Sequence, residues 1–114
     1  MQIVARPFEG WTILDVSGDI DLAHSPAMRK VLLGEIREKR IKKVILNLGA
    51  VRYIDSSGIA SLVEGLKASR DQGSRLILYG LSKTVREVME LSRLQRIFEI
   101  YDSEEQALSS DGRK

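Results

Sequence analysis

Apolar positions along this chain alternate between short continuous runs and stretches with the periodicity of a helix. The run from Val44 to Leu48 has the length and composition of a buried strand. Apolar residues then recur at i, i+3, i+4 and i+7, at Ile59, Leu62, Val63 and Leu66. This spacing is typical of one face of an amphipathic helix. The segment from Tyr53 to Leu62 therefore predicts a strand that passes through a turn into a helix.

The N-terminal residues predict a β-hairpin. Two strand-like runs, Gln2–Phe8 and Trp11–Val16, flank the short turn Glu9-Gly10. A turn this short joins strands that are antiparallel neighbours. The hairpin is followed by the stretch from Gly18 to His24, which reads as a loop.

A first helix is predicted after this loop. Ser25-Pro26 is typical of an N-cap followed by proline at the first helical position. Apolar residues at helical spacing then form a buried stripe, and the helix is expected to end near Lys39. The residues of the stripe are Met28, Val31, Leu32 and Ile36.

The second half of the chain continues the alternation of strands and helices. The second helix is expected to begin near Ser57 and to stop at Gln72, because Gly73 suits the left-handed conformation past a helix end. The later elements are a strand Arg75–Tyr79, a helix capped by Ser82 with inner residues Val85, Val88 and Met89, a link from Arg93 to Gln95, a strand Ile97–Ile100, and a short helix capped by Asp102 or Ser103.

The resulting order, β-β-α-β-α-β-α-β-α, predicts an α/β fold. Strands that alternate with helices imply right-handed crossovers and a parallel sheet after the opening hairpin. We therefore expect one domain over residues 1–108, with a mixed, mostly parallel sheet of about five strands and about four helices. The polar residues 109–114 are expected to form a flexible C-terminal tail.

Composition narrows the range of functions. The 114 residues include no cysteine, which excludes disulfides, thiolate metal sites and cysteine nucleophiles. The absence of cysteine fits a reducing, cytoplasmic location. The N-terminus lacks the apolar core of a signal peptide, and no apolar run approaches the roughly 18 residues that cross a bilayer, so no membrane insertion is expected. The formal net charge of +2 argues neither for nor against an acidic partner.

The one basic cluster is interpreted as the solvated end of a helix, where cations are favoured by the helix dipole. Its members are Arg37, Lys39, Arg40, Lys42 and Lys43. A nucleic-acid surface would combine such a cluster with exposed aromatic residues. Each aromatic residue lies in or beside an apolar run, where core packing explains it, so no direct binding of nucleic acid is expected.

Residues that would support catalysis, cofactor binding or metal binding are few. The single histidine, His24, lies in a predicted loop without a positioned partner for acid–base chemistry. Asp19 and Asp21 lack the later glycine and glutamate of a calcium loop and are better read as turn formers or as charges exposed to a partner. No glycine-rich phosphate loop occurs. The sequence therefore favours neither an enzyme nor a metal or cofactor site.

Two hydroxyls, on Ser56 and Ser57, lie at the start of the second predicted helix. Backbone N–H groups at a helix start have no partners within the helix. A serine hydroxyl there caps the helix, or it carries a phosphate that is favoured by the positive end of the helix dipole. Because helix boundaries are uncertain by a residue or two, Ser56 is an alternative cap that would leave Ser57 exposed.

Several segments together resemble the anti-sigma factor antagonists, which are bacterial STAS domains. Asp55-Ser56-Ser57-Gly58-Ile59 before an amphipathic helix is similar to the family's hallmark, and Gly18-Asp19-Ile20-Asp21 is similar to its Gly-x-(Leu/Ile)-Asp loop. The segments from Leu76 to Leu81, from Val85 to Leu91 and from Leu94 to Phe98 follow the family pattern for the third helix and last strand. The resemblance extends from about Val4 to Leu108.

This resemblance implies a phosphorylation switch in transcription regulation. A protein of this type binds an anti-sigma factor that is also a serine kinase, which frees the sigma factor. The kinase then phosphorylates the second serine of the hallmark, here Ser57, the complex dissociates, and a serine phosphatase resets the cycle. The implied partner-binding residues are Asp21, Asp55, Ser56, Ser57 and Gly58. Asp21 is similar to a carboxylate that meets a basic residue of the kinase, and Gly58 lacks a Cβ that would hinder its approach.

Two other classes of function remain open. One is a STAS-type binding subunit without a phosphorylation switch, for example in a membrane lipid-transport ATPase complex. Such domains often replace the serine that is phosphorylated, whereas this chain retains both Ser56 and Ser57. The other class is an enzyme or nucleotide binder, which the missing catalytic groups disfavour.

Overall fold

A five-stranded sheet in the order β1-β2-β3-β4-β5 forms the centre of the computed structural model, which describes residues 1–110. The first pair of strands is antiparallel and the other three pairs are parallel. The strands are β1 (Gln2–Phe8), β2 (Trp11–Ile20), β3 (Lys43–Ile54), β4 (Arg75–Tyr79) and β5 (Glu99–Tyr101). The prediction of a mixed, mostly parallel sheet is thereby confirmed.

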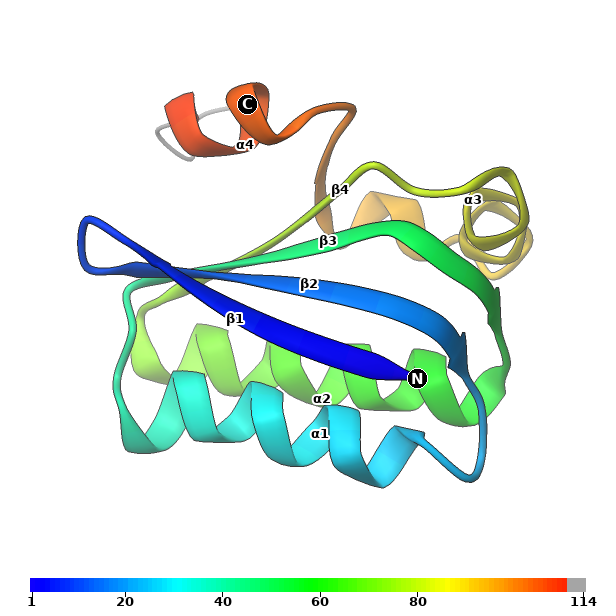
Figure 1. Cartoon of the computed structure of the whole chain (residues 1–114), viewed down its shortest axis with the longest axis horizontal. Helices are drawn as coiled ribbons and strands as arrows, with labels where there is room; N and C mark the ends of the chain where they lie inside the picture. The colour runs from blue at the N-terminus through cyan, green and yellow to red at the C-terminus, as the bar shows by residue number, and fades with distance from the viewer. Residues whose placement is uncertain (111–114) are drawn as a thin grey trace.

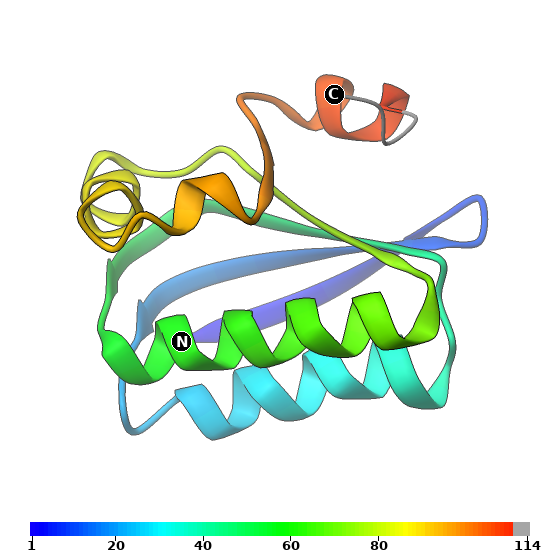
Figure 2. The same cartoon turned by 180° about the vertical axis from the view of Figure 1, so that it is seen from behind.

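Helices cover both faces of this sheet. Figures 1 and 2 show α1 and α2 side by side on one face, with α3 and α4 on the other. The helices are α1 (Ser25–Leu33), α2 (Ser56–Gln72), α3 (Lys83–Leu91) and α4 (Glu104–Ser109). A π-helical turn (Gly34–Glu38) extends α1, and a 3₁₀ turn (Leu94–Arg96) follows α3.

The two faces of the sheet explain the continuous apolar runs. Leu14, Leu46 and Leu78 are aligned across β2, β3 and β4 and belong to the main core, beneath which α1 and α2 pack. Their neighbours Ile13, Ile45 and Ile77 are also aligned and form a second cluster with Ala107 of α4. Strands that are buried on both faces need apolar side chains at successive positions rather than at alternate ones. In α2, the predicted stripe packs as expected, since Leu62 and Leu66 are buried and Ile59 and Val63 lie against the core.

The strands β2 and β3 are longer than predicted. β2 continues to Ile20, so the prediction of a loop from Gly18 is wrong for residues 18–20. β2 stays paired with β3 beyond Asp15. The ladder contains two register shifts, one between Asp15 and Ser17 and one between Gly18 and Asp19. The true loop is therefore residues 21–24.

The start of α1 also differs from the prediction. Ser25 is not the N-cap: it lies within the helix and is buried, and His24 occupies the cap position without a capping side chain. Asp21 instead bonds to the backbone at the helix start: its side chain accepts a hydrogen bond from the backbone N–H of His24 at 3.1 Å. Its carbonyl oxygen accepts another from the N–H of Ser25 at 2.8 Å.

The remaining helix ends follow the predictions closely. Gly73 has the left-handed conformation after α2, Ser82 caps α3, and Ser103 caps α4. The last strand, however, is Glu99–Tyr101 rather than Ile97–Ile100. Residues 97 and 98 instead donate their N–H groups to the carbonyl of Leu94, which ties them to the 3₁₀ turn.

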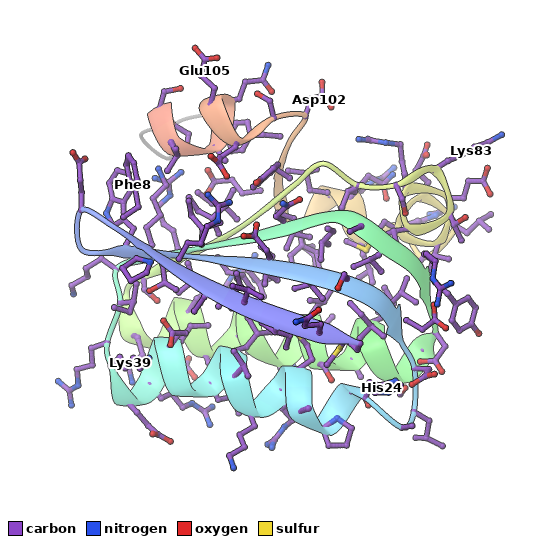
Figure 3. The ribbon with its side chains drawn as sticks, in the orientation of Figure 1. Phe8, His24, Lys39, Lys83, Asp102 and Glu105 are labelled. Carbon is purple, nitrogen blue, oxygen red and sulfur yellow. The ribbon has the colours of Figure 1, made fainter. Side chains whose placement is uncertain are left out.

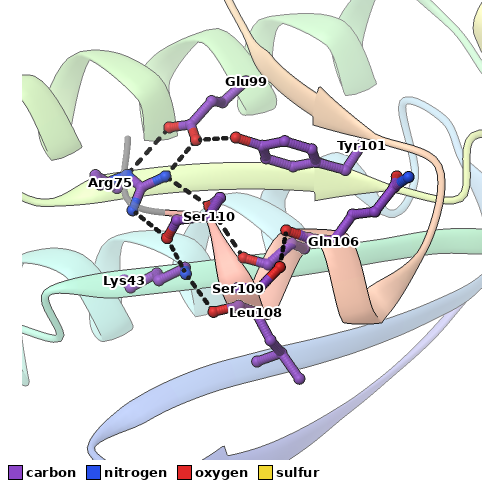
Figure 4. Close-up of polar contacts among 9 residues, drawn as sticks. Lys43, Arg75, Glu99, Tyr101, Gln106, Leu108, Ser109 and Ser110 are labelled. Atoms are coloured by element: carbon purple, nitrogen blue, oxygen red, sulfur yellow. Dashed lines mark hydrogen bonds and ion pairs between the residues drawn. The ribbon is translucent and has the colours of Figure 1, made fainter. Parts of the chain in front are cut away.

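Lys43 departs from the interpretation of the basic cluster as solvated. The other four members of the cluster are exposed, but Lys43 is only 3% exposed. Its ammonium group lies 4.1 Å from the centre of the Trp11 ring and donates hydrogen bonds to the carbonyl oxygens of Leu108 and Ser110 (Figure 4). A cation over an aromatic face is stabilised by the ring quadrupole. Lys43 is thus a buried residue that fixes the end of α4.

The division into a domain over 1–108 and a flexible tail over 109–114 stays a prediction. Ser109 is the last residue of α4, and Ser110 contacts both Lys43 and Arg75. Residues 111–114 lie outside the described residues.

Candidate functional site

The N-terminus of α2 is capped by Asp55. Its carboxylate oxygen Oδ1 accepts hydrogen bonds from the backbone N–H of Ser57 at 3.0 Å and of Gly58 at 3.1 Å. Two of the unpaired N–H groups at the helix start are thereby satisfied. The interpretation of Ser57 or Ser56 as the cap is therefore wrong, because the aspartate before them already fills this role.

The hydroxyl of Ser57 is consequently not needed for capping. It is half-buried and donates a hydrogen bond to Oδ1 of Asp55 at 2.5 Å. This bond is the largest of several that hold the pKa of Asp55 below its usual value, together with the backbone bonds from Gly58, Ser57 and Leu22. The Ser57 oxygen thus lies in the first turn of α2, oriented by a charged carboxylate and partly open to solvent.

Ser56 differs from its neighbour in both exposure and contacts. Its side chain is exposed and forms no hydrogen bond with another residue of the described part of the chain. The two adjacent serines therefore offer a matched pair: one hydroxyl is held by Asp55 and the other is not.

Gly58 has an internal reason to be glycine. A Cβ at this position would lie 2.4 Å from the carbonyl oxygen of Ile20 and 2.7 Å from Cγ1 of Ile54. Side chains do not tolerate such distances, so α2 packs this closely on β2 and β3 only with glycine here. This packing requirement explains the glycine without a partner, and the interpretation that Gly58 eases the approach of a kinase stays a prediction. Its role in binding a partner stays a prediction that its burial does not favour.

The loop between β2 and α1 lies directly beside the start of α2. The N–H of Asp55 donates to the carbonyl of Ile20 at 3.3 Å, and the backbone of Leu22 bonds to the Asp55 carboxylate. Asp21 is half-buried and its carboxylate is 2.6 Å from Nδ1 of His24. Figure 3 shows His24 at this end of the molecule, opposite the end where Phe8 and Lys39 lie.

The two carboxylates of the Gly-x-(Leu/Ile)-Asp segment have different surroundings. Asp19 is on β2 and forms an ion pair with Arg52 of β3, with 3.6 Å between Oδ1 and Nε. Asp21 forms the turn into α1. The reading of Asp21 as a turn former is confirmed, whereas Asp19 belongs to a strand.

Two exposed apolar side chains beside these residues were not predicted as part of the site. Leu22 is 76% exposed and Tyr53 is 48% exposed. The position of Tyr53 beside an apolar run predicts core packing, which is wrong. β3 is paired with β4 only as far as Asn47. Beyond that point β4 no longer pairs with β3, and the carbonyl of Val51 accepts a hydrogen bond from the Ser82 hydroxyl at 2.8 Å. We call the group Asp21, Leu22, Tyr53, Asp55, Ser56 and Ser57 the site surface.

The described residues offer no metal centre at this surface or elsewhere. Within residues 1–110, no group of three histidine, cysteine, aspartate or glutamate side chains is arranged to hold an ion. No helix in that range is long and apolar enough to cross a membrane. The site surface offers one oriented hydroxyl on Ser57, one exposed hydroxyl on Ser56, two carboxylates and the exposed side chains of Leu22 and Tyr53.

Comparison with known proteins gives one consistent family. The model of the STAS domain family matches residues 2–107. An anti-sigma F factor antagonist from Paenibacillus polymyxa is 26% identical over 109 residues, which cover 96% of this chain and 93% of the relative. An anti-sigma-B factor antagonist from Listeria monocytogenes is 31% identical over 90 residues, which cover 78% of this chain and 77% of the relative.

Solved structures agree with this result. A candidate anti-sigma factor antagonist from Thermotoga maritima has a TM-score of 0.90 at 25% identity, covering 97% of this chain and 95% of the other. The phosphorylated form of the Bacillus protein SpoIIAA has a TM-score of 0.73 at 20% identity, covering 94% and 96%. The second likeness concerns the fold alone.

Proposed function

Because the chain belongs to the STAS domain family, we propose that it is an anti-sigma factor antagonist that is switched off by phosphorylation of Ser57. In its unmodified form it binds an anti-sigma factor with serine kinase activity, which releases a sigma factor for transcription. A serine phosphatase returns the modified protein to the binding form. The names of the relatives support the binding activity, and the geometry at Ser57 supports the switch.

The proposal rests on the contacts of the Ser57 hydroxyl. Asp55 caps α2 through backbone N–H groups, so the helix start does not depend on the Ser57 side chain. The same carboxylate orients the hydroxyl at 2.5 Å. A serine that is positioned but structurally dispensable is suited to modification.

The transfer step forms a bond between Ser57 Oγ and the γ-phosphorus of ATP held by the kinase. The bond from this phosphorus to the bridging oxygen of ADP breaks, and the hydroxyl proton passes to a base of the kinase or to water. Asp55 positions the hydroxyl during this step. Because the pKa of Asp55 is lowered, its carboxylate is a weak base and is better suited to hold the hydroxyl than to remove its proton.

The phosphorylated protein is expected to stay folded. A phosphoserine carries a charge of about −1.5 to −2 at neutral pH, and it would lie at the positive end of the α2 dipole. Repulsion from Asp55 opposes this, but the backbone bonds of the cap do not involve the Ser57 oxygen. The phosphorylated SpoIIAA structure is of the same fold, which supports a scaffold that accepts the phosphate.

The interface with the anti-sigma factor is where the phosphate acts. The site surface presents Leu22 and Tyr53 as apolar contacts and Asp21 as a partner for a basic side chain. A dianion on Ser57 would be buried without a partner in a surface formed around a neutral hydroxyl. Leaving a buried charge unpaired costs roughly 3–5 kcal/mol, which corresponds to about a 150- to 5,000-fold loss of affinity.

The test is phosphorylation by the cognate anti-sigma kinase with ATP, followed by mapping of the phosphate by mass spectrometry. We expect one phosphate on Ser57 in the wild type and in Ser56→Ala, and none in Ser57→Ala. A phosphate on Ser56, or no phosphate while the kinase is bound, would contradict the proposed switch. Binding without phosphorylation would favour the STAS-type subunit that lacks a switch.

A further inference from the structure

The edge of the sheet formed by β1 has free hydrogen-bonding groups in a regular pattern. A two-residue turn joins β1 to β2, with positive φ angles of 49° at Glu9 and 85° at Gly10. Such a turn makes its flanking residues a hydrogen-bonded pair, and hydrogen-bonded pairs then alternate along an antiparallel ladder. The even-numbered residues of β1 therefore bond to β2, and the N–H and C=O groups of Ile3 and Ala5 point outward. Pro7, which has no N–H, also belongs to the outward set.

A groove runs along this edge between β1 and the α1 helix with its π-helical turn. It encloses about 410 Å³ and includes Ile3 and Ala5 on one side and Val31 and Gly34 on the other. In Figure 1, β1 lies along the front of the sheet, with α1 below it. No Cβ is present at Gly34, and nothing lies within 4 Å of where one would be.

Two charged side chains of opposite sign line the groove at equal spacing from Gly34. Lys30 lies four residues before it and Glu38 four residues after it, and both line the groove. Within residues 1–110 neither side chain forms a hydrogen bond or a close ion pair, although the Glu38 carboxylate acts on Lys39 at longer range and helps to raise its pKa. The two other charged residues of the groove, Glu35 and Lys39, are already paired with each other at 2.7 Å.

We propose that this edge is a homodimer interface, in which two copies are related by a two-fold axis that passes near Val4 and Gly34. A two-fold axis at Val4 pairs Ile3 with Ala5 of the partner subunit, and Ala5 with Ile3 of the partner subunit. Each such pair exchanges two N–H···O bonds between the outward-facing groups. The two sheets then form one continuous sheet, and the exposed side chain of Val4 meets its own copy on the outer face.

The same axis brings opposite charges together. Lys30 faces Glu38 of the partner subunit and Glu38 faces Lys30 of the partner subunit, because both lie at equal spacing from Gly34. The glycine at the centre allows the two helices to approach. An unrelated peptide strand could use the backbone of β1, but a lysine and a glutamate at equal spacing from one glycine match a second copy of the same chain.

The test uses charge reversal in the full chain, followed by sedimentation equilibrium over a series of protein concentrations. Lys30→Glu places two glutamates opposite each other, and Glu38→Lys does the same with two lysines. Each single variant is expected to weaken the dimer about tenfold or more, since two attractive pairs become two repulsive ones. An equimolar mixture of the two variants restores attraction on both sides and is expected to form a heterodimer as tight as the wild-type dimer.

Lys67→Glu serves as the control, because it makes the same charge change at an exposed position on α2. Its dimerisation is expected to equal that of the wild type, and circular dichroism checks that all variants fold. Hydrogen exchange of the Ile3 and Ala5 amides should slow as the wild-type concentration rises. A wild type that is monomeric at every concentration, a dimer unaffected by either reversal, or a mixture that fails to associate would overturn the proposal.

Discussion

Polar side chains lie at both ends of the sheet: those of Ser56 and Ser57 at one end, which we call the site end, and those of Lys43 and Arg75 at the other. The first pair stays accessible, whereas the second pair bonds within the molecule. At the site end, Asp55 satisfies the helix start and leaves the hydroxyls of Ser56 and Ser57 partly or fully exposed. At the opposite end, which we call the hairpin end, Lys43 and Arg75 are joined to Ser110, and Arg75 also pairs with Glu99 (Figure 4). Hydrogen bonds formed inside the molecule stabilise it, whereas the groups that stay accessible at the surface are those that the proposed function uses.

Burial determines whether a charged residue stabilises the fold or stays accessible at the surface. The hairpin end binds the C-terminal helix to the sheet, because the Lys43 ammonium donates to two carbonyl oxygens that follow or end α4. Burial, together with the nearby Arg75, lowers the pKa of Lys43. At the site end the carboxylate of Asp55 stays charged in contact with solvent. A change at the hairpin end should therefore affect folding, and a change to an exposed group at the site end should affect binding.

The largest loss of stability is expected for a substitution at Gly58, which is packed inside the molecule at the site end. Gly58→Val would force a side chain against the Ile20 carbonyl and Ile54. We expect the free energy of unfolding to fall by about 3 kcal/mol or more, measured by urea denaturation. The control is Ala60→Val, an exposed position in the same helix, with an expected cost of about 0.5 kcal/mol. Equal losses in the two variants would show that Gly58 is not closely packed.

The hairpin end is tested by Lys43→Met, which keeps the length of the side chain but removes its donors. The carbonyls of Leu108 and Ser110 lose a partner, and we expect a loss of about 1–3 kcal/mol in unfolding free energy. Binding of the anti-sigma factor should be unchanged. A variant with normal stability and impaired binding would contradict the claim that changes at the hairpin end affect folding rather than binding.

The cap provides a smaller effect on stability at the site end. Asp55→Ala removes the acceptor for two backbone N–H groups and should cost about 1 kcal/mol. The matched change Ser56→Ala should leave the thermal midpoint unaltered. If Ser56→Ala were the more damaging variant, the assignment of the cap to Asp55 would be wrong.

The smallest effect concerns the pKa of Asp55. The folded-state pKa lies below the ordinary value, so the carboxylate contributes stability that is present above the unfolded-state pKa and is lost as the pH falls through the folded-state pKa. Ser57→Ala removes the largest cause, so the pKa of Asp55 should rise toward its ordinary range. An NMR titration of the Asp55 carboxylate measures this directly, and an unchanged pKa would exclude the Ser57 hydroxyl as the cause.

Local patterns predicted the arrangement of elements because each depends on neighbours in sequence. The stripe of α2, the left-handed Gly73 and the capping serine Ser82 all follow from residues within a few positions of one another. The extension of β2 to Ile20 could not be predicted in this way. It depends on pairing with β3, more than twenty residues later, across two register shifts.

The sequence predicted that the segment with the two serines begins a helix, but not the contacts that its residues form. The segment from Asp55 to Gly58 is at a helix start as expected, and the preference of aspartate for N-caps was a signal that the sequence contained. The internal contact of Gly58 with Ile20 joins distant parts of the chain, so no local pattern could reveal it. The exposure of Tyr53 likewise depends on which distant segments cover that face of β3.

The most direct test of the proposed switch is an isothermal titration of the cognate anti-sigma factor with the unmodified and the Ser57-phosphorylated protein. We predict that the phosphorylated form binds about 150- to 5,000-fold more weakly. Equal affinities of the two forms would contradict the claim that a phosphate on Ser57 controls the interaction.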